Sequence, residues 1–543
     1  MASSRCFAAR GALSAVLGSG CLYSPRDSES ETVVIVGTRD VDILFVIDNS
    51  GTMAEEQLRL SQNFASFIQV LESKDVDANY RIGITTSDSG NPRCPASTYT
   101  PENGALVLSS CLDRVDDDEF RANGEDFSSA CTDFCAKRNA DLKVVPTTTQ
   151  YDSKPAPRAW IERIDGKSNI GGVSSNVEAF RCYGPQGVAG CGFEQQLESM
   201  YHALVKASDK NYPSNYGFLR ESAILSIIII TDEADCSYQE AQKEIFTTNK
   251  VFWYDPNEDV APTSAVCWKA GVECTGTSPY SECHAANYGL DGAVGAPKPE
   301  AVLRPVSDYI DFVRSLEAGK RAIDDSQRVV ISLIAGVPLG YDTREAEIAY
   351  ADSPDEFYQE NFGIGPGCVW EETMGWPSTA VPPVREREFA EAFIDPGASG
   401  RNLYTICQDD YSAALRTIAE RIRDRLEPLC LPRCALDTVP DSATLEPNCQ
   451  VFEDSRGVRT ELPLCIEIDG KRAIPAGATA CYGMRTDPGQ TTTSELDDMS
   501  RSCVDEGSNL EFVLLRAIAA AEGATISAKC ELSGEPNHDC PLL

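Results

Sequence analysis

VDILFVIDNSGTM, residues 41–53, joins a continuous apolar run to a group of small polar residues. Residues 43–47 are all apolar, which is typical of a strand that helices cover on both faces. Asp48 follows this run directly, and Gly51 allows a tight turn before the next element. Because a carboxylate at the end of a buried strand needs a partner, Asp48 is the first candidate for a functional residue.

Outward from this stretch, apolar runs alternate with segments of helical periodicity. We predict strands at 42–48, 80–86, 223–230 and 329–337, and helices from about residue 54 and at 193–207, 306–320 and 411–426. Strands that alternate with helices indicate a doubly wound α/β fold with a mainly parallel, Rossmann-like sheet.

Composition divides the chain into four segments. We predict a signal peptide at 1–20, a lipidated tether at 21–40, an α/β domain at 41–427 and a small disulfide-rich domain at 428–543. The α/β domain carries cysteine-bearing or Gly- and Pro-rich inserts at about 88–190, 236–300 and 338–400. The last segment holds eight cysteines, many turn residues and one helix-like run at 511–521.

The N-terminus has the layout of an export signal. Two arginines precede a short apolar stretch that could not span a bilayer, and LGSGC follows at 17–21. LGSGC resembles a bacterial lipobox, in which Cys21 becomes the lipidated first residue of the mature protein. Ordinary cleavage near Gly20 is the alternative. Leu22 replaces the aspartate that retains many lipoproteins in an inner membrane, so we expect an outer-membrane or cell-surface location and a lipid anchor as the sole membrane attachment.

Cysteine count and charge both restrict the function. Of 22 cysteines, 22 − 2 = 20 are left when Cys6 leaves with the signal and Cys21 carries lipid. An even number in an exported chain predicts ten disulfides. The close pairs in CTDFC (131–135) and CLPRC (430–434) suggest zinc as an alternative, but none of the three histidines lies near them. The net charge of −37 excludes nucleic acid as a partner and favours cations.

Two carboxylates are expected to meet at one edge of the predicted sheet. Asp48 and Asp232 each end an apolar strand, and ligands bind at the carboxyl ends of parallel strands. Ser50 and Thr52 add hydroxyl groups, and such hard oxygen ligands suit Mg²⁺, Mn²⁺ or Ca²⁺. TMAE at 52–55 also matches a capping box, so Thr52 could instead cap the following helix.

This pattern resembles the von Willebrand factor type A domain and its metal-ion-dependent adhesion site. The first motif of that family, D-x-S-x-S, matches Asp48 to Thr52, with a threonine in place of the last serine. The distal aspartate of the family matches Asp232, with Glu233 in place of a glycine. The resemblance therefore implies a metal site formed by Asp48, Ser50, Thr52 and Asp232.

This chain departs from the family at the middle motif. The threonine of that motif aligns with Val188 or Ala189, which cannot bind a metal, so we expect Glu194 or water to substitute. The segments FVIDNSGTM, GCGFEQ and TDEADCS occur together with the lipobox and many cysteines. This combination resembles cysteine-rich surface lipoproteins common in myxobacteria.

The resemblance implies a non-enzymatic surface lipoprotein that holds Mg²⁺, or alternatively Mn²⁺ or Ca²⁺. An Asp or Glu of a protein ligand completes the coordination shell of this ion. No small-molecule cofactor is expected. A structural envelope component with a degenerate metal site is the alternative. A phosphoryl-transfer enzyme that uses Asp48 is less favoured: DNSGT resembles D-x-x-G-T, but Ser50 stands where such phosphatases carry a second aspartate.

Overall fold

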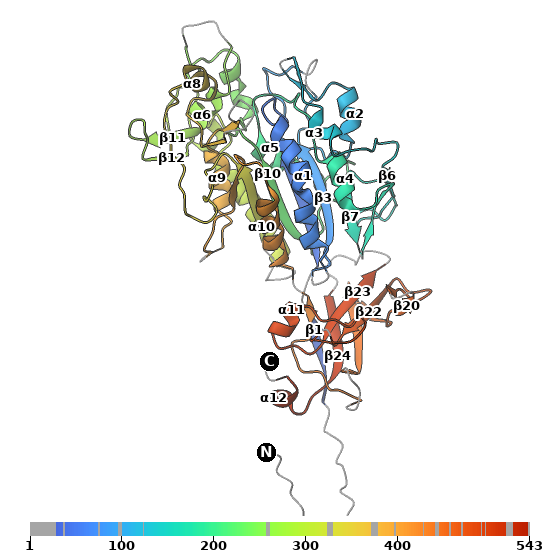
Figure 1. Ribbon diagram of the computed structural model, residues 1–543. Helices are drawn as coiled ribbons and strands as arrows, with labels where there is room; N and C mark the ends of the chain where they lie inside the picture. Colours follow the sequence, from blue (N-terminus) through green and yellow to red (C-terminus); the bar gives the residue numbers. More distant parts are fainter. Residues whose placement is uncertain are drawn as a thin grey trace, which may run out of the picture.

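The computed structural model of the protein describes residues 29–540 except 36–38, 74–75, 96–99, 123, 165, 257–260, 323–328, 371–377, 396–397, 427, 440–444, 456–457, 469–470, 490, 495 and 517–524. Figure 1 shows an α/β part above and a smaller part, built mostly from strands, below. The predicted signal peptide and Cys21 lie outside the described residues. Within the described ranges, no helix is long and apolar enough to cross a bilayer.

The α/β part is built on one large mixed sheet. Its strand order is β16-β13-β10-β2-β3-β7-β8. The members are β2 (Asp40–Ile47), β3 (Asn79–Thr86), β7 (Trp160–Ile164), β8 (Lys167–Ser168), β10 (Ile224–Ile230), β13 (Val329–Ala335) and β16 (Leu403–Thr405). The first five strands in this order are parallel, and β7 and β8 are antiparallel. All four predicted strands are therefore present in the sheet.

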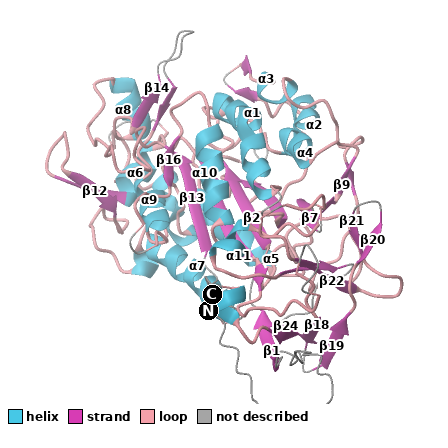
Figure 2. Ribbon diagram, turned by 60° about the horizontal axis from the view of Figure 1, so that its bottom comes forward, coloured by secondary structure: helices cyan, strands magenta, loops and turns pink. Residues whose placement is uncertain are grey.

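Helices cover both faces of this sheet (Figure 2). One face packs against α1 (Ala54–Leu71), α4 (Asn176–Tyr183) and α10 (Ser412–Arg423), and the other against α5 (Gln196–Ala207), α7 (Val306–Arg321) and α9 (Val384–Glu391). Successive side chains of a strand point to opposite faces. Accordingly, Phe45 packs on Phe64 and Phe67 of α1, whereas Leu44 and Val46 pack on the α5 side.

The first predicted insert contributes to the sheet, which the sequence did not indicate. Strand β7 pairs antiparallel with β3, and Ile161 lies opposite Ile82. Glu162 obscured this strand because a charge interrupts its apolar pattern. In the fold Glu162 is buried, since it forms an ion pair with Arg81 at 2.7 Å. The short edge strand β16, which runs parallel to β13, was missed as well.

The inserts carry further short elements. In the first lie α2 (Cys111–Asp116), β4 (Arg121–Ala122), β5 (Glu125–Asp126), α3 (Ser129–Thr132), β6 (Lys143–Val144) and β9 (Ile170–Gly171). In the second lie η1 (Glu240–Phe246), α6 (Ala265–Gly271), β11 (Val272–Thr275), β12 (Glu282–Ala285) and η2 (Lys298–Glu300). In the third lie α8 (Glu356–Phe362), β14 (Cys368–Trp370) and β15 (Ser378–Ala380).

The predicted tether at 21–40 is wrong in part, because it contains strand β1 (Glu29–Ile35). This strand pairs along its whole length with β24 (Thr525–Leu532), at the edge of a sheet with the order β1-β24-β18-β19. The β-branched run TVVI, 32–35, suits a strand, and Val33 packs against a core formed by the C-terminal residues. The first and the last described strands, β1 and β24, are therefore neighbours in one sheet.

The remaining C-terminal elements are mainly strands. They are β17 (Leu429–Cys430), β18 (Cys449–Ser455), β19 (Val458–Leu462), β20 (Ile466–Ile468), β21 (Lys471–Ala473), β22 (Ala480–Arg485), α11 (Arg501–Asp505), β23 (Glu511–Arg516) and α12 (Pro536–Asp539). The helix predicted at 511–521 is wrong over its described part, which is β23. This strand pairs with β22 on one side and β17 on the other, so sheet pairing overrides the local helical pattern.

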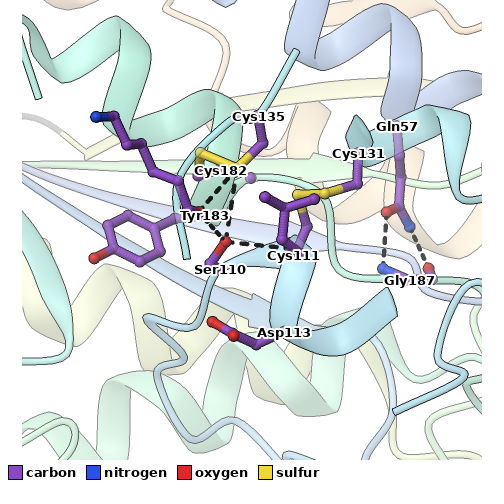
Figure 3. The surroundings of a disulfide bond; sticks show 12 residues. Gln57, Ser110, Cys111, Asp113, Cys131, Cys135, Cys182, Tyr183 and Gly187 are labelled. Atoms are coloured by element: carbon purple, nitrogen blue, oxygen red, sulfur yellow. Dashed lines mark hydrogen bonds between the residues drawn. A yellow bond between two sulfur atoms is a disulfide. The ribbon is translucent and has the colours of Figure 1, made fainter. Parts of the chain in front are cut away.

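Ten disulfides are present, as predicted from the cysteine count. Six join residues within 94–407, and four join residues within 430–540. The sulfur atoms of Cys111, Cys131 and Cys135 lie within 4.8 Å of one another, but they belong to two disulfides, Cys111–Cys131 and Cys135–Cys182 (Figure 3). Cys430 and Cys434 are likewise bonded to other cysteines. The zinc alternative is therefore wrong, and the disulfides indicate an oxidising compartment.

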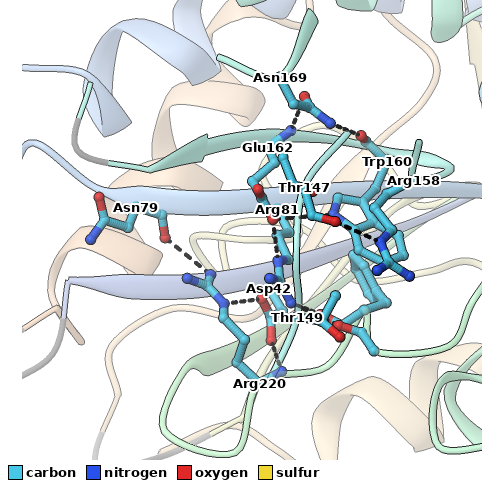
Figure 4. Close-up of polar contacts among 12 residues, drawn as sticks. Asp42, Asn79, Arg81, Thr147, Thr149, Arg158, Trp160, Glu162, Asn169 and Arg220 are labelled. Atoms are coloured by element: carbon cyan, nitrogen blue, oxygen red, sulfur yellow. Dashed lines mark hydrogen bonds and ion pairs between the residues drawn. The ribbon is translucent and has the colours of Figure 1, made fainter. Parts of the chain in front are cut away.

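A buried ion-pair network links the amino-terminal half of β2 to its neighbours (Figure 4). Asp42 of β2, which is fully buried, accepts from the backbone and side chain of Arg220, with Oδ1 2.8 Å from Nε. Arg81 lies opposite Asp42 in β3 and pairs with Glu162. Arg81 also donates to the carbonyl groups of Gly217 and Phe218. The network thus ties three strands to the segment that precedes β10.

Candidate metal centre

Asp48 and Asp232 meet at the carboxyl edge of the sheet, as the sequence predicted. Strands β2 and β10 are parallel, with Ile47 opposite Ile230, so the residues that follow them emerge side by side. The Asp48 backbone N–H donates to the Ile230 carbonyl at 2.9 Å, which continues the ladder one step beyond β2. Asp48 is fully buried, and Asp232 is 5 % exposed.

The Asp48 carboxylate is held by donors from both strands' ends. Its Oδ1 accepts from the Ser50 backbone N–H at 2.8 Å, and its Oδ2 accepts from the Thr231 hydroxyl at 2.6 Å. The Thr231 hydroxyl in turn accepts from the side-chain amide of Gln196, at the start of α5. These bonds fix the direction in which the carboxylate points.

Ser50 and Thr52 place two hydroxyl groups beside this carboxylate. Their oxygens lie 3.1 Å apart, with Ser50 buried and Thr52 exposed. The capping-box alternative for Thr52 is wrong, because α1 has Met53 as its N-cap residue and no side-chain cap bond. The Thr52 hydroxyl instead forms a hydrogen bond with the Ser50 hydroxyl, and it lowers the pKa of Asp232 against the larger effect of burial.

The loop before α5 brings Glu194, rather than Val188 or Ala189, towards Asp48. Val188 is buried and apolar, and its N–H donates to the Glu119 carbonyl, while Ala189 is exposed. Glu194 is 1 % exposed, and its Oε2 accepts from the Ser87 hydroxyl at 2.8 Å.

Ser87 is a site residue that the sequence reasoning missed. It follows β3 directly, and its N–H donates to the carbonyl of Ile47, the residue before Asp48. The available signal was TTS, 85–87, at the end of a predicted parallel strand. Any polar residue at that position shares an edge with Asp48.

Burial raises the pKa of four carboxyl groups in this site, and repulsion from Asp48 adds to the shift in three of them. Burial raises the pKa of Asp48, which hydrogen bonds from Thr231 and Ser50 partly offset. Burial raises the pKa of Asp232 and Glu194 well above their usual values, and the Asp48 charge adds to both shifts. Burial, with the Asp48 charge, raises the pKa of Glu233 to about 8. The pKa values of these four groups thus depend mainly on burial, on neighbouring carboxylates and on hydrogen-bond donors.

Two carboxylate oxygens in the site have no hydrogen-bond partner. These are Asp232 Oδ1 and Glu194 Oε1, both buried. A buried carboxylate oxygen without a partner costs free energy that a bound cation would offset. Asp48, Ser50, Thr52, Asp232 and Glu194 offer carboxylate or hydroxyl oxygens as ligand atoms, which suits a hard divalent cation. The residues therefore fit the ion that the resemblance implies.

All three inserts close around the centre. From the first, the Gly190 N–H donates to the Asn49 carbonyl at 2.8 Å. From the second, the Ser264 hydroxyl donates to the Gly192 carbonyl at 2.8 Å. From the third, the Val381 N–H donates to the Asp232 carbonyl at 2.7 Å. Thr52 is the exposed member of the proposed ligand set, so access to the centre runs past this residue.

Comparison with known proteins gives little guidance. No protein-family model and no curated protein matches the sequence. Two structures of the pilus adhesin SpaC from Lactobacillus rhamnosus GG, one in an open conformation, have TM-scores of 0.27 with 9 % and 10 % identity. The alignments cover 92 % of this chain and 40 % of SpaC. The pilus adhesin RrgA from Streptococcus pneumoniae has a TM-score of 0.20 and 10 % identity over 93 % of this chain and 58 % of RrgA. This chain spans less than two thirds of either adhesin, and the similarity is too low to carry an argument.

Proposed function

We propose that the α/β part, residues 41–427, is a doubly wound type A domain that binds one divalent cation through Asp48, Ser50, Thr52 and Asp232. The bound cation would attach the protein to an Asp or Glu of a protein partner. The observation that carries this proposal is the pair of buried, unpartnered oxygens of Asp232 and Glu194 at the sheet edge that also holds Asp48 and the paired hydroxyls of Ser50 and Thr52. Such an arrangement is costly without a cation and favourable with one.

The side chains have separate roles in this proposal. Asp48, held by Thr231 and by the Ser50 N–H, would supply the charged ligand in a fixed direction. Ser50 and Thr52 would add neutral oxygens, which leave positive charge on the ion. That charge would attract a partner's carboxylate past the exposed Thr52. The function is binding, and no bond is broken, so we propose a protein that is not an enzyme.

Two other functions have less support. A structural envelope component without a metal is favoured by Val188, which offers no ligand atom, and by the inserts that cover the centre. It leaves the buried Asp232 Oδ1 and Glu194 Oε1 without a partner. Phosphoryl transfer through Asp48 is disfavoured, because Ser50 stands where such phosphatases carry a second carboxylate.

Anchorage at the bacterial surface is the second part of the proposal. We infer that Cys21 carries lipid and that the C-terminal residues 428–543 form a separate, disulfide-rich domain. Cys21→Ser should then release the protein from the membrane fraction, because stable attachment depends on buried acyl chains. The measurement is the ratio of membrane-bound to soluble protein after cell fractionation. Equal retention of the variant and the parent would exclude lipid anchorage at this residue.

Thermal unfolding with and without divalent ions tests the metal site. Millimolar Mg²⁺, Mn²⁺ or Ca²⁺ should raise the Tm above its value in EDTA, because an ion that binds the native state stabilises it by mass action. Thr52→Ala should reduce this increment without abolishing it, since it removes one neutral ligand. Thr417→Ala, on the exposed side of α10, is the matched control and should leave the increment unchanged. An equal increment in all three proteins would remove Thr52 from the ligand set.

A further inference from the structure

Two buried glutamates enlarge the proposed ligand set of Asp48, Ser50, Thr52 and Asp232. Glu194 comes from the loop before α5, and Glu233 follows Asp232 directly. The exposed fraction is 1 % for Glu194 and 7 % for Glu233. Glutamates buried to this extent are rare in proteins unless they are paired. The position of these two residues at the carboxyl edge of the sheet therefore calls for a role.

Glu194 is oriented by a hydroxyl group at the carboxyl edge of the sheet. Ser87, whose N–H donates to the Ile47 carbonyl one residue before Asp48, donates its hydroxyl to Glu194 Oε2 at 2.8 Å. Glu194 Oε1 is buried and has no partner, which leaves it available to an ion.

Glu233 approaches the same centre from the end of β10. Its backbone N–H donates to the Thr231 hydroxyl at 3.2 Å, and that hydroxyl donates to Asp48. The Thr231 hydroxyl therefore links the Glu233 backbone to the Asp48 carboxylate, and the Glu233 side chain is buried at the same edge of the sheet.

We infer that Glu194 and Glu233 are ligands of the bound ion and make the centre selective for Ca²⁺ over Mg²⁺. This inference rests on the proposed metal site. Mg²⁺ takes six ligands in a strict octahedron, keeps several waters and is usually held by one or two carboxylates. Ca²⁺ takes six to eight oxygens in flexible geometry and tolerates several carboxylates. Four carboxylates and two hydroxyls therefore fit Ca²⁺ better.

The number of protein ligands also determines which ion can bind a partner's carboxylate. Six protein ligands fill the octahedron of Mg²⁺ and leave no position for a partner's carboxylate. Ca²⁺ has room for one or two further oxygens beside the same six residues. Attachment to an acidic group should therefore depend on Ca²⁺, and the two glutamates would set this dependence.

Isothermal titration of the metal-free protein with CaCl₂ and, separately, with MgCl₂ tests the inference. The parent should bind one Ca²⁺ with a Kd at least about tenfold lower than that for Mg²⁺. The double variant Glu194→Gln, Glu233→Gln should lose this preference, because the amides keep the size of the side chains but remove two charges. Glu386→Gln is the matched control: Glu386 is fully buried and both of its carboxylate oxygens lack partners, but its charged neighbours are Asp235 and Arg385.

The outcomes separate the inference from the proposal on which it rests. If the parent binds Mg²⁺ as tightly as Ca²⁺, the selectivity inference is overturned and the metal site stands. If neither ion binds, the metal site itself is overturned. A preference that persists in the double variant, or that Glu386→Gln also removes, would show that Glu194 and Glu233 do not set it. If the double variant is unfolded by circular dichroism, Glu233→Gln alone is titrated and should reduce the preference.

Discussion

Asp42→Ala should lower the free energy of unfolding by about 3–5 kcal/mol, the usual cost of leaving a buried charge without its partner. Asp42 is fully buried and bonds both the backbone and the side chain of Arg220. Arg220 is itself only 6 % exposed, so water cannot replace the lost carboxylate. The cost should be the same in EDTA and in Ca²⁺, because Asp42 lies in the amino-terminal half of β2 and Asp48 follows its other end.

Urea unfolding of Asp42→Ala, with Asp40→Ala as the matched control, measures this effect. Asp40 pairs with the same arginine at 3.2 Å, but its side chain is 32 % exposed. Ion pairs that reach solvent typically contribute about 0.2–1 kcal/mol, so the control should be close to the parent. If Asp42→Ala costs no more than Asp40→Ala, the buried network does not have the structural role described above.

Asp48→Ala should abolish the stabilisation of the protein by divalent ions. An ion present at one hundred times its Kd stabilises the native state by about 2.7 kcal/mol, and this increment should vanish with the charged ligand. Asp232→Ala should also reduce this increment, because it removes a second carboxylate of the proposed ligand set. The measurement is the difference in Tm between Ca²⁺ and EDTA for each variant.

Asp48→Asn separates charge from shape in the same assay. The asparagine keeps the shape of the side chain and its amide oxygen can still accept from the Ser50 N–H, but its NH2 group cannot accept from the Thr231 hydroxyl and it offers the ion no charge. We expect its metal increment to be as small as that of Asp48→Ala, while its Tm in EDTA stays closer to the parent. A full metal increment in either variant would contradict a site centred on Asp48.

The sheet could be predicted because its central strands are locally encoded. Residues 43–47 and 223–230 are continuous apolar runs that read as buried strands wherever they occur. Parallel pairing then brings the ends of these strands to one edge, which is how Asp48 and Asp232 could be placed together from sequence alone. The even cysteine count similarly predicted ten disulfides, although not which cysteines would pair.

Features that depend on distant partners could not be predicted. Strand β7 could not be predicted because the charge of Glu162 interrupts its apolar pattern, and only the fold shows that Arg81 pairs with this charge. Strand β1 could not be predicted because it forms by pairing with β24, which is distant in sequence. Ser87 and Glu194 belong to the centre only through their mutual hydrogen bond, which joins segments more than a hundred residues apart. A motif that is contiguous in sequence reveals Asp48 to Thr52, whereas ligands assembled by the fold are visible only in three dimensions.

Equilibrium dialysis against Ca²⁺, followed by elemental analysis of the protein, tests the central claim most directly. The account predicts one tightly held ion per chain in the parent and none in Asp48→Ala, with both proteins folded and all disulfides intact. A parent that holds no ion, or an Asp48→Ala variant that holds as much as the parent, would contradict it, and the structural envelope protein would then be the better explanation.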